Sequence, residues 1–178
     1  MPNSLNGWPV LAPGSSQLVT KAIPSVKRRI TMRKDVIPLF LAMAYDYHYW
    51  ASALDVGSTD EGGYNYRKSR VVTTRWSNHS SGTAVDLNWS VEGALNSAIG
   101  KAFFSEPEVR KAITVIKAIY GDVLDWGGDW RTQKDYMHWE IKPGTSAAEV
   151  AALIKHLGIR ANGVRTRNAM GEPIPPRN

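Results

Sequence analysis

The sequence predicts a single α+β domain, in which a small antiparallel sheet is flanked by helices. Apolar residues recur at helical spacing in several segments, one of which ends before Gly121. Short β-branched or alternating segments, typical of strands, lie between these helical segments. The chain has 178 residues, of which 43% are hydrophobic, so it can bury one sizeable core but has little room for a second domain.

The ends of the chain differ in composition from its middle. Four prolines interrupt residues 1–34, and we expect an irregular leader that packs on the domain, with one short strand around residues 30–32. Residues 35–158 should form the domain itself. Residues 159–178 are basic and contain prolines, and we expect a loose tail there.

The first predicted helix begins near Asp35, which can cap it, and continues to Leu54. Pro38 is tolerated because it falls in the first turn, where a backbone N–H would have no helical partner. The β-branched residues 71–74 predict a strand that leads the chain to His79.

The second predicted helix begins with a capping box formed by Ser105 and Glu108, and Pro107 lies in its first turn. Its apolar residues recur at helical spacing up to Gly121, and we expect it to cover one face of the sheet. A strand is expected at residues 123–126.

A last helix is predicted from its two ends. Ser146 and Glu149 have the spacing of a capping box, and Gly158 is suited to the residue that follows a helix.

Residues 76–88 contain a histidine and an aspartate that are separated by a turn. Gly82 allows the chain to reverse after His79, and Thr83 to Trp89 then reads as a strand. Val85 and Leu87 alternate with Asp86, so the carboxylate faces away from the apolar side.

A second polar segment follows at residues 135–140. His138 and Glu140 share one face of a predicted strand, while Trp139 and Ile141 take the other and pack into the core. Asp135 has the opposite parity to His138, so it must lie in a turn before the strand to reach the same site. Two histidines and one carboxylate are the usual protein ligands of a catalytic zinc, which keeps its fourth position for water.

These residues resemble a known family. The pattern His-x-x-Gly-x-Ala-x-Asp, followed by Trp126 to Trp130 and then by Asp-x-x-His, is similar to zinc peptidases related to D-Ala-D-Ala carboxypeptidases and phage L-alanyl-D-glutamate endopeptidases. The resemblance covers roughly residues 35–142. It implies the fold that such peptidases share with hedgehog-type signalling domains, with the zinc site on the small sheet.

The resemblance also implies roles for particular residues. His79, Asp86 and His138 would bind Zn²⁺, and Asp135 would be the general base, where the dipeptidase branch of the family carries glutamate. Residues 63–67 are similar to a tyrosine-arginine element of the family, which suggests that Arg67 contacts a substrate carboxylate or the oxyanion.

The sequence allows two roles for Glu140. It is either an alternative base or a hydrogen-bond partner of a ligand histidine, and the second reading is the more favourable one.

The function implied by the resemblance is hydrolysis of a peptide bond in peptidoglycan stem peptides. We expect a phage endolysin that cleaves the L-Ala–D-Glu bond. A D-Ala-D-Ala carboxypeptidase of the same family is one alternative, and a non-catalytic, zinc-containing cell-wall-binding module is another. An iron oxygenase with two histidines and one carboxylate is disfavoured, because the interval from His79 to Asp86 is longer than the His-x-Asp spacing expected there.

Composition restricts the partners and the location. The absence of cysteine excludes disulfides, thiolate zinc sites and a cysteine nucleophile. The formal charge of +6 favours association with polyanions such as an anionic cell wall, while no nucleic-acid-binding motif is present. No apolar run is long enough to span a membrane, and the first residues do not resemble a signal peptide. We therefore expect a monomer made in the host cytoplasm that acts on bacterial peptidoglycan without binding nucleic acid or inserting into the membrane.

Overall fold

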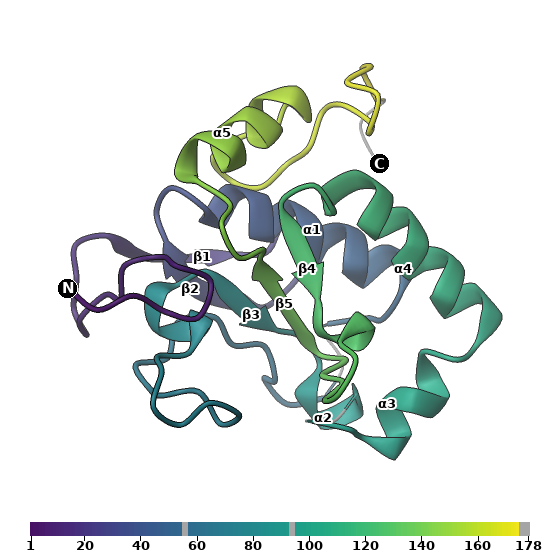
Figure 1. Ribbon diagram of the computed structural model, residues 1–178. Coiled ribbons are helices and arrows are strands. Elements are labelled where there is room, and N and C mark those ends of the chain that lie inside the picture. Colours follow the sequence, from purple (N-terminus) through teal and green to yellow (C-terminus); the bar gives the residue numbers. More distant parts are fainter. Residues whose placement is uncertain (55–56, 93–94, 175–178) are drawn as a thin grey trace.

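The computed structural model describes residues 1–54, 57–92 and 95–174 (Figure 1). Its strands are β1 (Leu18–Ala22), β2 (Arg29–Arg33), β3 (Ala84–Asp86), β4 (Leu124–Trp126) and β5 (His138–Ile141). Its α-helices are α1 (Ile37–Trp50), α2 (Trp89–Glu92), α3 (Ala98–Phe103), α4 (Pro107–Tyr120) and α5 (Ala147–His156). Two short 3₁₀ helices, η1 (Asn78–Ser81) and η2 (Gly127–Asp129), adjoin the central sheet. This mixed composition confirms the predicted α+β class.

The central sheet has three antiparallel strands in the order β3-β5-β4. Its register places Asp86 directly opposite His138, and Val85 opposite Trp139. Trp139 and Ile141 are buried in the core, whereas His138 and Glu140 line a cavity on the other face. The predicted alternation of residues 138–141 is therefore confirmed.

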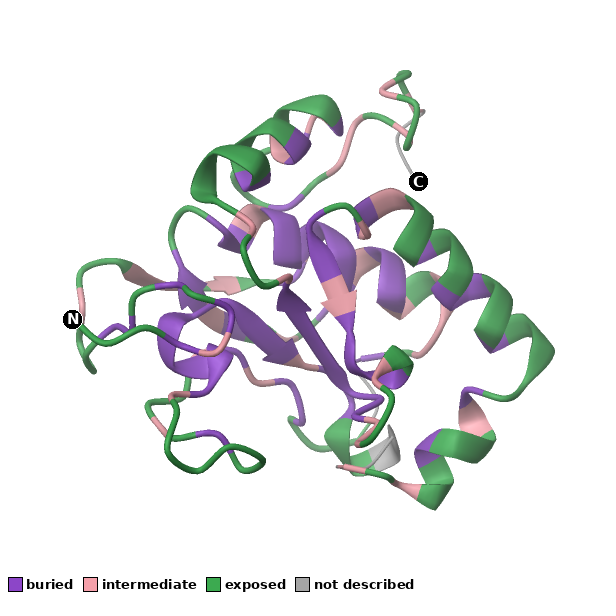
Figure 2. Ribbon diagram, in the orientation of Figure 1, coloured by how far each residue is buried: buried purple, intermediate pink, exposed green. Residues whose placement is uncertain are grey.

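Helices α1 and α4 pack against each other (Figure 1). Helix α4 also contacts β4 of the central sheet, while α1 contacts β1 and β2. Helix α1 is buried on almost every side, while α4 buries the apolar stripe Val109, Ile113, Ile116 and Tyr120 and exposes its opposite face (Figure 2). Helix α4 lies against β4, as expected of a helix that covers one face of the sheet. Among the described residues, no helix combines the length and the apolar character needed to cross a bilayer.

Two predicted helix caps are wrong. No side chain caps α1, and the Asp35 carboxylate instead pairs with Arg33 at 3.2 Å. Helix α4 also lacks a side-chain cap, because the Ser105 hydroxyl donates to the Lys101 carbonyl oxygen in the turn that follows α3. In both helices the predicted proline does lie in the first turn. Helix α1 ends at Trp50, earlier than expected.

The predicted strand at residues 71–74 is also wrong. The Ser69 hydroxyl oxygen accepts hydrogen bonds of 3.1 Å from the backbone N–H groups of both Val71 and Val72. These bonds hold the segment as a turn, and the two valine side chains are exposed. The strand expected at Thr83 to Trp89 is shorter than predicted, because Asn88 adopts a positive φ of 52° and α2 begins at the next residue.

The leader contains more regular structure than expected. Strands β1 and β2 form an antiparallel hairpin, which includes the predicted strand at residues 30–32 and adds β1. The first residues pack beside the central sheet. The Asn6 amide donates to the hydroxyl of Thr83, which precedes β3, and to the carbonyl oxygen of Ile141 in β5.

The C-terminal part begins with the predicted capping box of Ser146 and Glu149, and Gly158 follows α5 with a positive φ of 59°. Beyond the helix, the chain is tied back to the core. Arg165 forms a buried ion pair of 3.0 Å with Asp46 of α1. Residues 175–178 of the expected tail lie outside the described residues.

We predict that Arg165→Ala lowers the free energy of unfolding by about 3 kcal/mol, because it leaves the buried Asp46 carboxylate without the guanidinium that neutralises it. Urea denaturation would measure the loss. The matched control is Arg160→Ala, since Arg160 is exposed. Equal stabilities for the two variants would contradict the prediction.

Candidate active site

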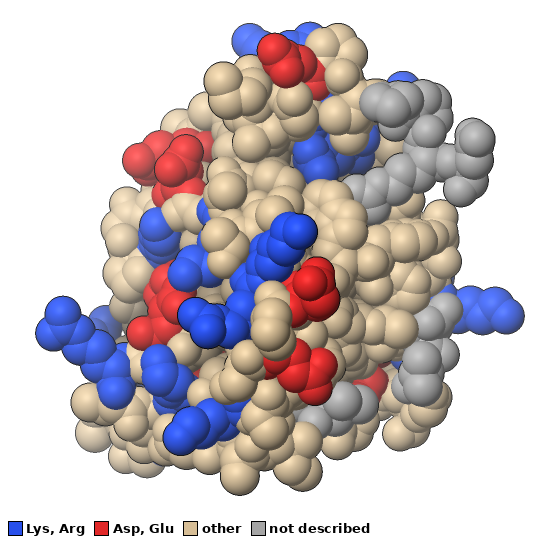
Figure 3. Space-filling view, turned by 90° about the vertical axis from the view of Figure 1, so that its right-hand side faces the viewer, with Lys and Arg blue, Asp and Glu red and all other residues tan. Residues whose placement is uncertain are grey.

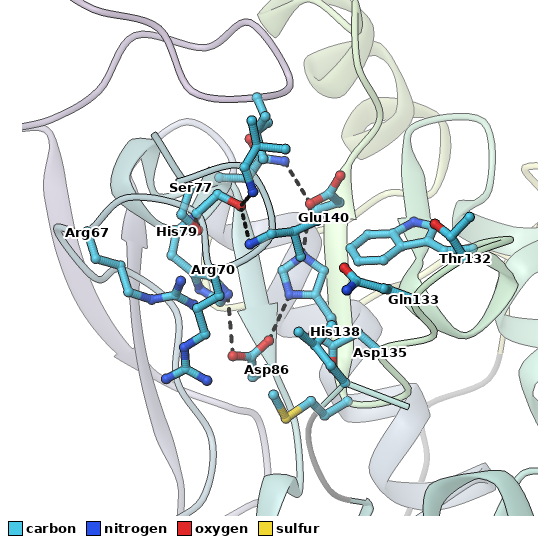
Figure 4. A pocket seen from close by; sticks show the side chains of 18 residues that line it. Arg67, Arg70, Ser77, His79, Asp86, Thr132, Gln133, Asp135, His138 and Glu140 are labelled. Atoms are coloured by element: carbon cyan, nitrogen blue, oxygen red, sulfur yellow. Dashed lines mark hydrogen bonds and ion pairs between the residues drawn. The ribbon is translucent and has the colours of Figure 1, made fainter. Parts of the chain in front are cut away.

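A cavity of about 280 Å³ opens beside the polar face of β5 (Figure 4). Its wall combines residues from the loop before η1, from β3 and from the segment between η2 and β5. The polar residues that matter for its chemistry are Arg67, Arg70, Asn78, His79, Asp86, Asp135, His138 and Glu140.

Three potential metal ligands meet at one point of this cavity. One ligand atom from each of His79, Asp86 and His138 lies within 4.8 Å of the others, so the group could hold a metal ion. The two oxygens of Asp86 face different histidines: Oδ2 is 3.3 Å from His79 Nε2, and Oδ1 is 2.8 Å from His138 Nδ1. The residues that the sequence pattern selects as ligands are therefore brought together.

A left-handed turn places His79 in this group. Gly82 has a φ of 68°, and a Cβ there would lie 2.7 Å from the backbone nitrogen of Arg33. Only glycine fits both the conformation and the close approach. The turn predicted after His79 is thus confirmed, and it returns the chain to β3.

The orientation of the His79 ring is fixed from behind. Its Nδ1 is 2.6 Å from the Gly63 carbonyl oxygen, so Nδ1–H is the donor. The other ring nitrogen, Nε2, is buried and has no hydrogen-bond partner among the described residues. With Nδ1 as the donor, a neutral His79 ring would offer its Nε2 lone pair to a metal, and Nε2 lies only 3.3 Å from Asp86 Oδ2 in the same group, so the site fits a metal ion.

The His138 ring lies between two carboxylates. Nδ1 faces Asp86, and Nε2 is 2.8 Å from Glu140 Oε2. Burial alone would lower the pKa of His138, but hydrogen bonds to the two carboxylates raise it to about 10. Burial likewise opposes ionisation of Asp86, yet the charge of His79 and the hydrogen bond to His138 hold the Asp86 pKa well below its usual range. The raised pKa of His138 thus favours an imidazolium between the two carboxylates when no metal is bound.

Asp135 lies in the irregular segment before β5, as predicted from its opposite parity to His138 along the strand. Its backbone N–H donates to the Gly127 carbonyl oxygen, and its own carbonyl accepts from His138 N. A Cβ on Gly127 would lie 2.4 Å from the Asp135 carbonyl oxygen, so glycine permits this approach. Asp135 Oδ1 is buried and unbonded within the described part of the chain, and burial raises the pKa of this carboxyl.

Two arginines line the cavity on the side of η1. Arg67 Nε is buried and makes no hydrogen bond to any described residue, and burial together with the charge of Arg70 lowers the Arg67 pKa. The sequence pattern selects Arg67 but gives no indication of Arg70, because the strand predicted at residues 71–74 does not place Arg70 at the site. The polar residues around Ser69 are the signal that could have indicated a turn.

The Glu140 carboxylate is already engaged in hydrogen bonds, which disfavours it as the general base. Its Oε2 atom faces His138 Nε2 and also accepts a 2.7 Å hydrogen bond from the Asn78 amide. Burial opposes ionisation, but these two hydrogen bonds lower the Glu140 pKa and keep it a carboxylate. The geometry favours the reading in which Glu140 orients a ligand histidine.

Comparison with known proteins supports the resemblance. Residues 71–141 match the model of a family described as D-alanyl-D-alanine carboxypeptidase. The match includes His79, Asp86, Asp135 and His138, while Arg67 and α1 lie outside it. This confirms the resemblance to the zinc peptidases and supports a peptidase of that family. No solved structure matches the chain.

We predict that the affinity for Zn²⁺ rises with pH by about tenfold per unit between pH 6 and pH 8, because His138 must release a proton to bind a metal. With its pKa raised to about 10, His138 keeps that proton throughout this range in the metal-free protein. Competition with a chelator at each pH would measure the affinity, after correction for the chelator's own protonation. An affinity independent of pH would contradict the prediction.

Proposed function

We propose that this peptidase of the D-alanyl-D-alanine carboxypeptidase family uses zinc to hydrolyse a peptide bond in peptidoglycan stem peptides, as phage L-Ala–D-Glu endolysins do. The observation that carries the proposal is the meeting of His79, Asp86 and His138 within 4.8 Å, in the same cavity as Asp135.

The residues fit a zinc site by their chemistry. Two imidazole nitrogens and one carboxylate are the protein ligands of many catalytic zinc sites. His79 Nε2 is buried and has no hydrogen-bond partner among the described residues. Zinc bound there would lower the pKa of water to about 7 and polarise the scissile carbonyl group.

Asp135 is the proposed general base. Asp135 lines the cavity, and its buried Oδ1 has no hydrogen-bond partner in the described structure, so the carboxylate is available to accept a proton from the attacking water. Because burial raises its pKa, the carboxyl can then return the proton to the nitrogen of the leaving amine. Glu140 lacks this freedom, since His138 and Asn78 already engage it.

Arg67 and Arg70 supply the positive charge of the cavity. The unbonded Nε of Arg67 and the nearby guanidinium of Arg70 suit a substrate carboxylate or the oxyanion that forms during hydrolysis. A stem peptide carries such carboxylates, so the two arginines are consistent with this substrate class.

Two alternatives remain of interest. The description of the matching family favours removal of a terminal D-Ala, which would use the same ligands and base. A non-catalytic wall-binding module would retain the metal ligands, but it would have no use for the buried, unbonded oxygen of Asp135.

The proposed partner is bacterial peptidoglycan, reached by a monomer after synthesis in the host cytoplasm, without binding nucleic acid or inserting into a membrane. Basic patches occur on the face that carries α3 and α4 (Figure 3). A pocket on this face is lined by Lys101, Arg110, Lys117 and Lys134, with Asp129 among them. These charges would favour an anionic wall, and salt should weaken that attraction.

We predict that Asp135→Asn retains zinc but lowers kcat by about 10²- to 10⁴-fold, because it removes the proton acceptor without removing a ligand. Zinc content by mass spectrometry and initial rates on peptidoglycan would test this. Asp129→Asn is the matched control, since Asp129 lies outside the cavity and pairs with Lys117. If Asp135→Asn hydrolyses peptidoglycan at the parent rate, Asp135 is not the general base.

We also predict that digestion of purified peptidoglycan releases new amino-terminal D-Glu residues, and that His79→Ala releases none. Mass spectrometry of the products would identify the bond. If free D-Ala is the sole product, the proposed activity is that of a carboxypeptidase and not of an endopeptidase. Zinc binding without any product would favour the wall-binding module.

A further inference from the structure

A chain of buried hydrogen bonds connects the N-terminal leader to the ligand His138. The Asn6 backbone N–H donates to Asn78 Oδ1 over 2.8 Å, and Asn78 Nδ2 donates to Glu140 Oε2 over 2.7 Å. Glu140 Oε2 in turn lies 2.8 Å from His138 Nε2. All four residues are buried, with exposed fractions of 2%, 3%, 8% and 6% in this order along the chain of bonds.

The direction of this chain is fixed at its far end. A backbone N–H can only donate, so the oxygen of the Asn78 amide must face Asn6 and its nitrogen must face Glu140. Asn6 is itself held in place, because its amide donates to Thr83 Oγ1 over 2.9 Å and to the Ile141 carbonyl oxygen over 3.0 Å. The leader is therefore anchored on the two strands that carry Asp86 and His138.

The direction determines what His138 can do. The Glu140 carboxylate has no proton to donate, so His138 Nε2 must be the donor of their hydrogen bond. When the ring is neutral, Nε2 keeps its proton and Nδ1 carries the lone pair. Nδ1 is the atom that faces Asp86, on the side where the three ligands meet.

We propose that Asn78 is a positioning residue, which holds Glu140 so that His138 keeps its proton on Nε2 and presents Nδ1 to the metal. The leader thereby becomes part of the metal site, although Asn6 and His138 are far apart in sequence. This inference rests on the proposed zinc ligand set. It also assigns Glu140 to ligand orientation and leaves Asp135 as the base.

The test compares Asn78→Ala with Asn88→Ala. Asn88 is also a buried asparagine beside β3, and its amide donates to Ser52 and Ala53, away from the histidines. Both variants lose two hydrogen bonds of a buried side chain, so a general loss of stability would affect both. Asn78→Ser, whose side chain is too short to bridge Asn6 and Glu140, serves if Asn78→Ala does not fold.

Two measurements are made on each full-length protein. Proton–nitrogen NMR follows solvent exchange of the His138 Nε2–H in the metal-free form, and chelator competition gives the affinity for Zn²⁺. In Asn78→Ala we expect exchange to be at least about tenfold faster and zinc affinity to be lower by about 10- to 100-fold. Asn88→Ala should match the parent in both.

The outcomes separate this inference from the proposed function. Parent-like exchange and zinc affinity in Asn78→Ala would overturn the positioning role, as would equal changes in the Asn88 control. The parent could bind no zinc while solvent exchange of the His138 Nε2–H still accelerates in Asn78→Ala alone. The hydrogen-bonded positioning of His138 by Asn78 would then stand, and the proposed zinc peptidase would fail.

Discussion

The pairing of β3 with β5 is the constraint on which the site depends. It places the Asp86 carboxylate directly opposite His138, and this carboxylate also approaches His79. Side chains alternate along a strand, so a slip of one residue would turn Asp86 toward the core and remove it from the cavity. Val85 and Trp139 form the adjacent pair, and they secure the register because both are fully buried in the hydrophobic core.

Loops complete what the sheet begins, and glycine makes their close approaches possible. Gly82 returns the chain from η1 to β3 beside Arg33, and Gly127 lets the segment of Asp135 lie against η2. A side chain at either position would meet backbone atoms at less than 3 Å. These close approaches bring His79 and the proposed base Asp135 to the cavity.

The site gathers more charge than a protein interior normally tolerates. His138 is shared by two carboxylates, and Asp135 Oδ1 is buried without a hydrogen-bond partner in the described structure. Burying such groups costs free energy unless opposite charge compensates them. A protonated His138 supplies part of this compensation, and a divalent cation at the same point would supply more. Asn78, held by Asn6, donates a further hydrogen bond to Glu140 Oε2.

The sequence by itself determined the class of fold, the face of β5 that carries His138 and Glu140, and the residues that meet as candidate ligands. These depend on local spacing, since strand parity and a glycine turn follow from a few neighbouring residues. Tertiary structure decided the rest. Residues 71–74 form a turn, in which the Ser69 hydroxyl accepts hydrogen bonds from the N–H groups of Val71 and Val72. Arg70 reaches the cavity through this turn. Asn78 enters the site because its partners Asn6 and Glu140 come from segments distant in sequence, and only folding brings them within hydrogen-bonding distance.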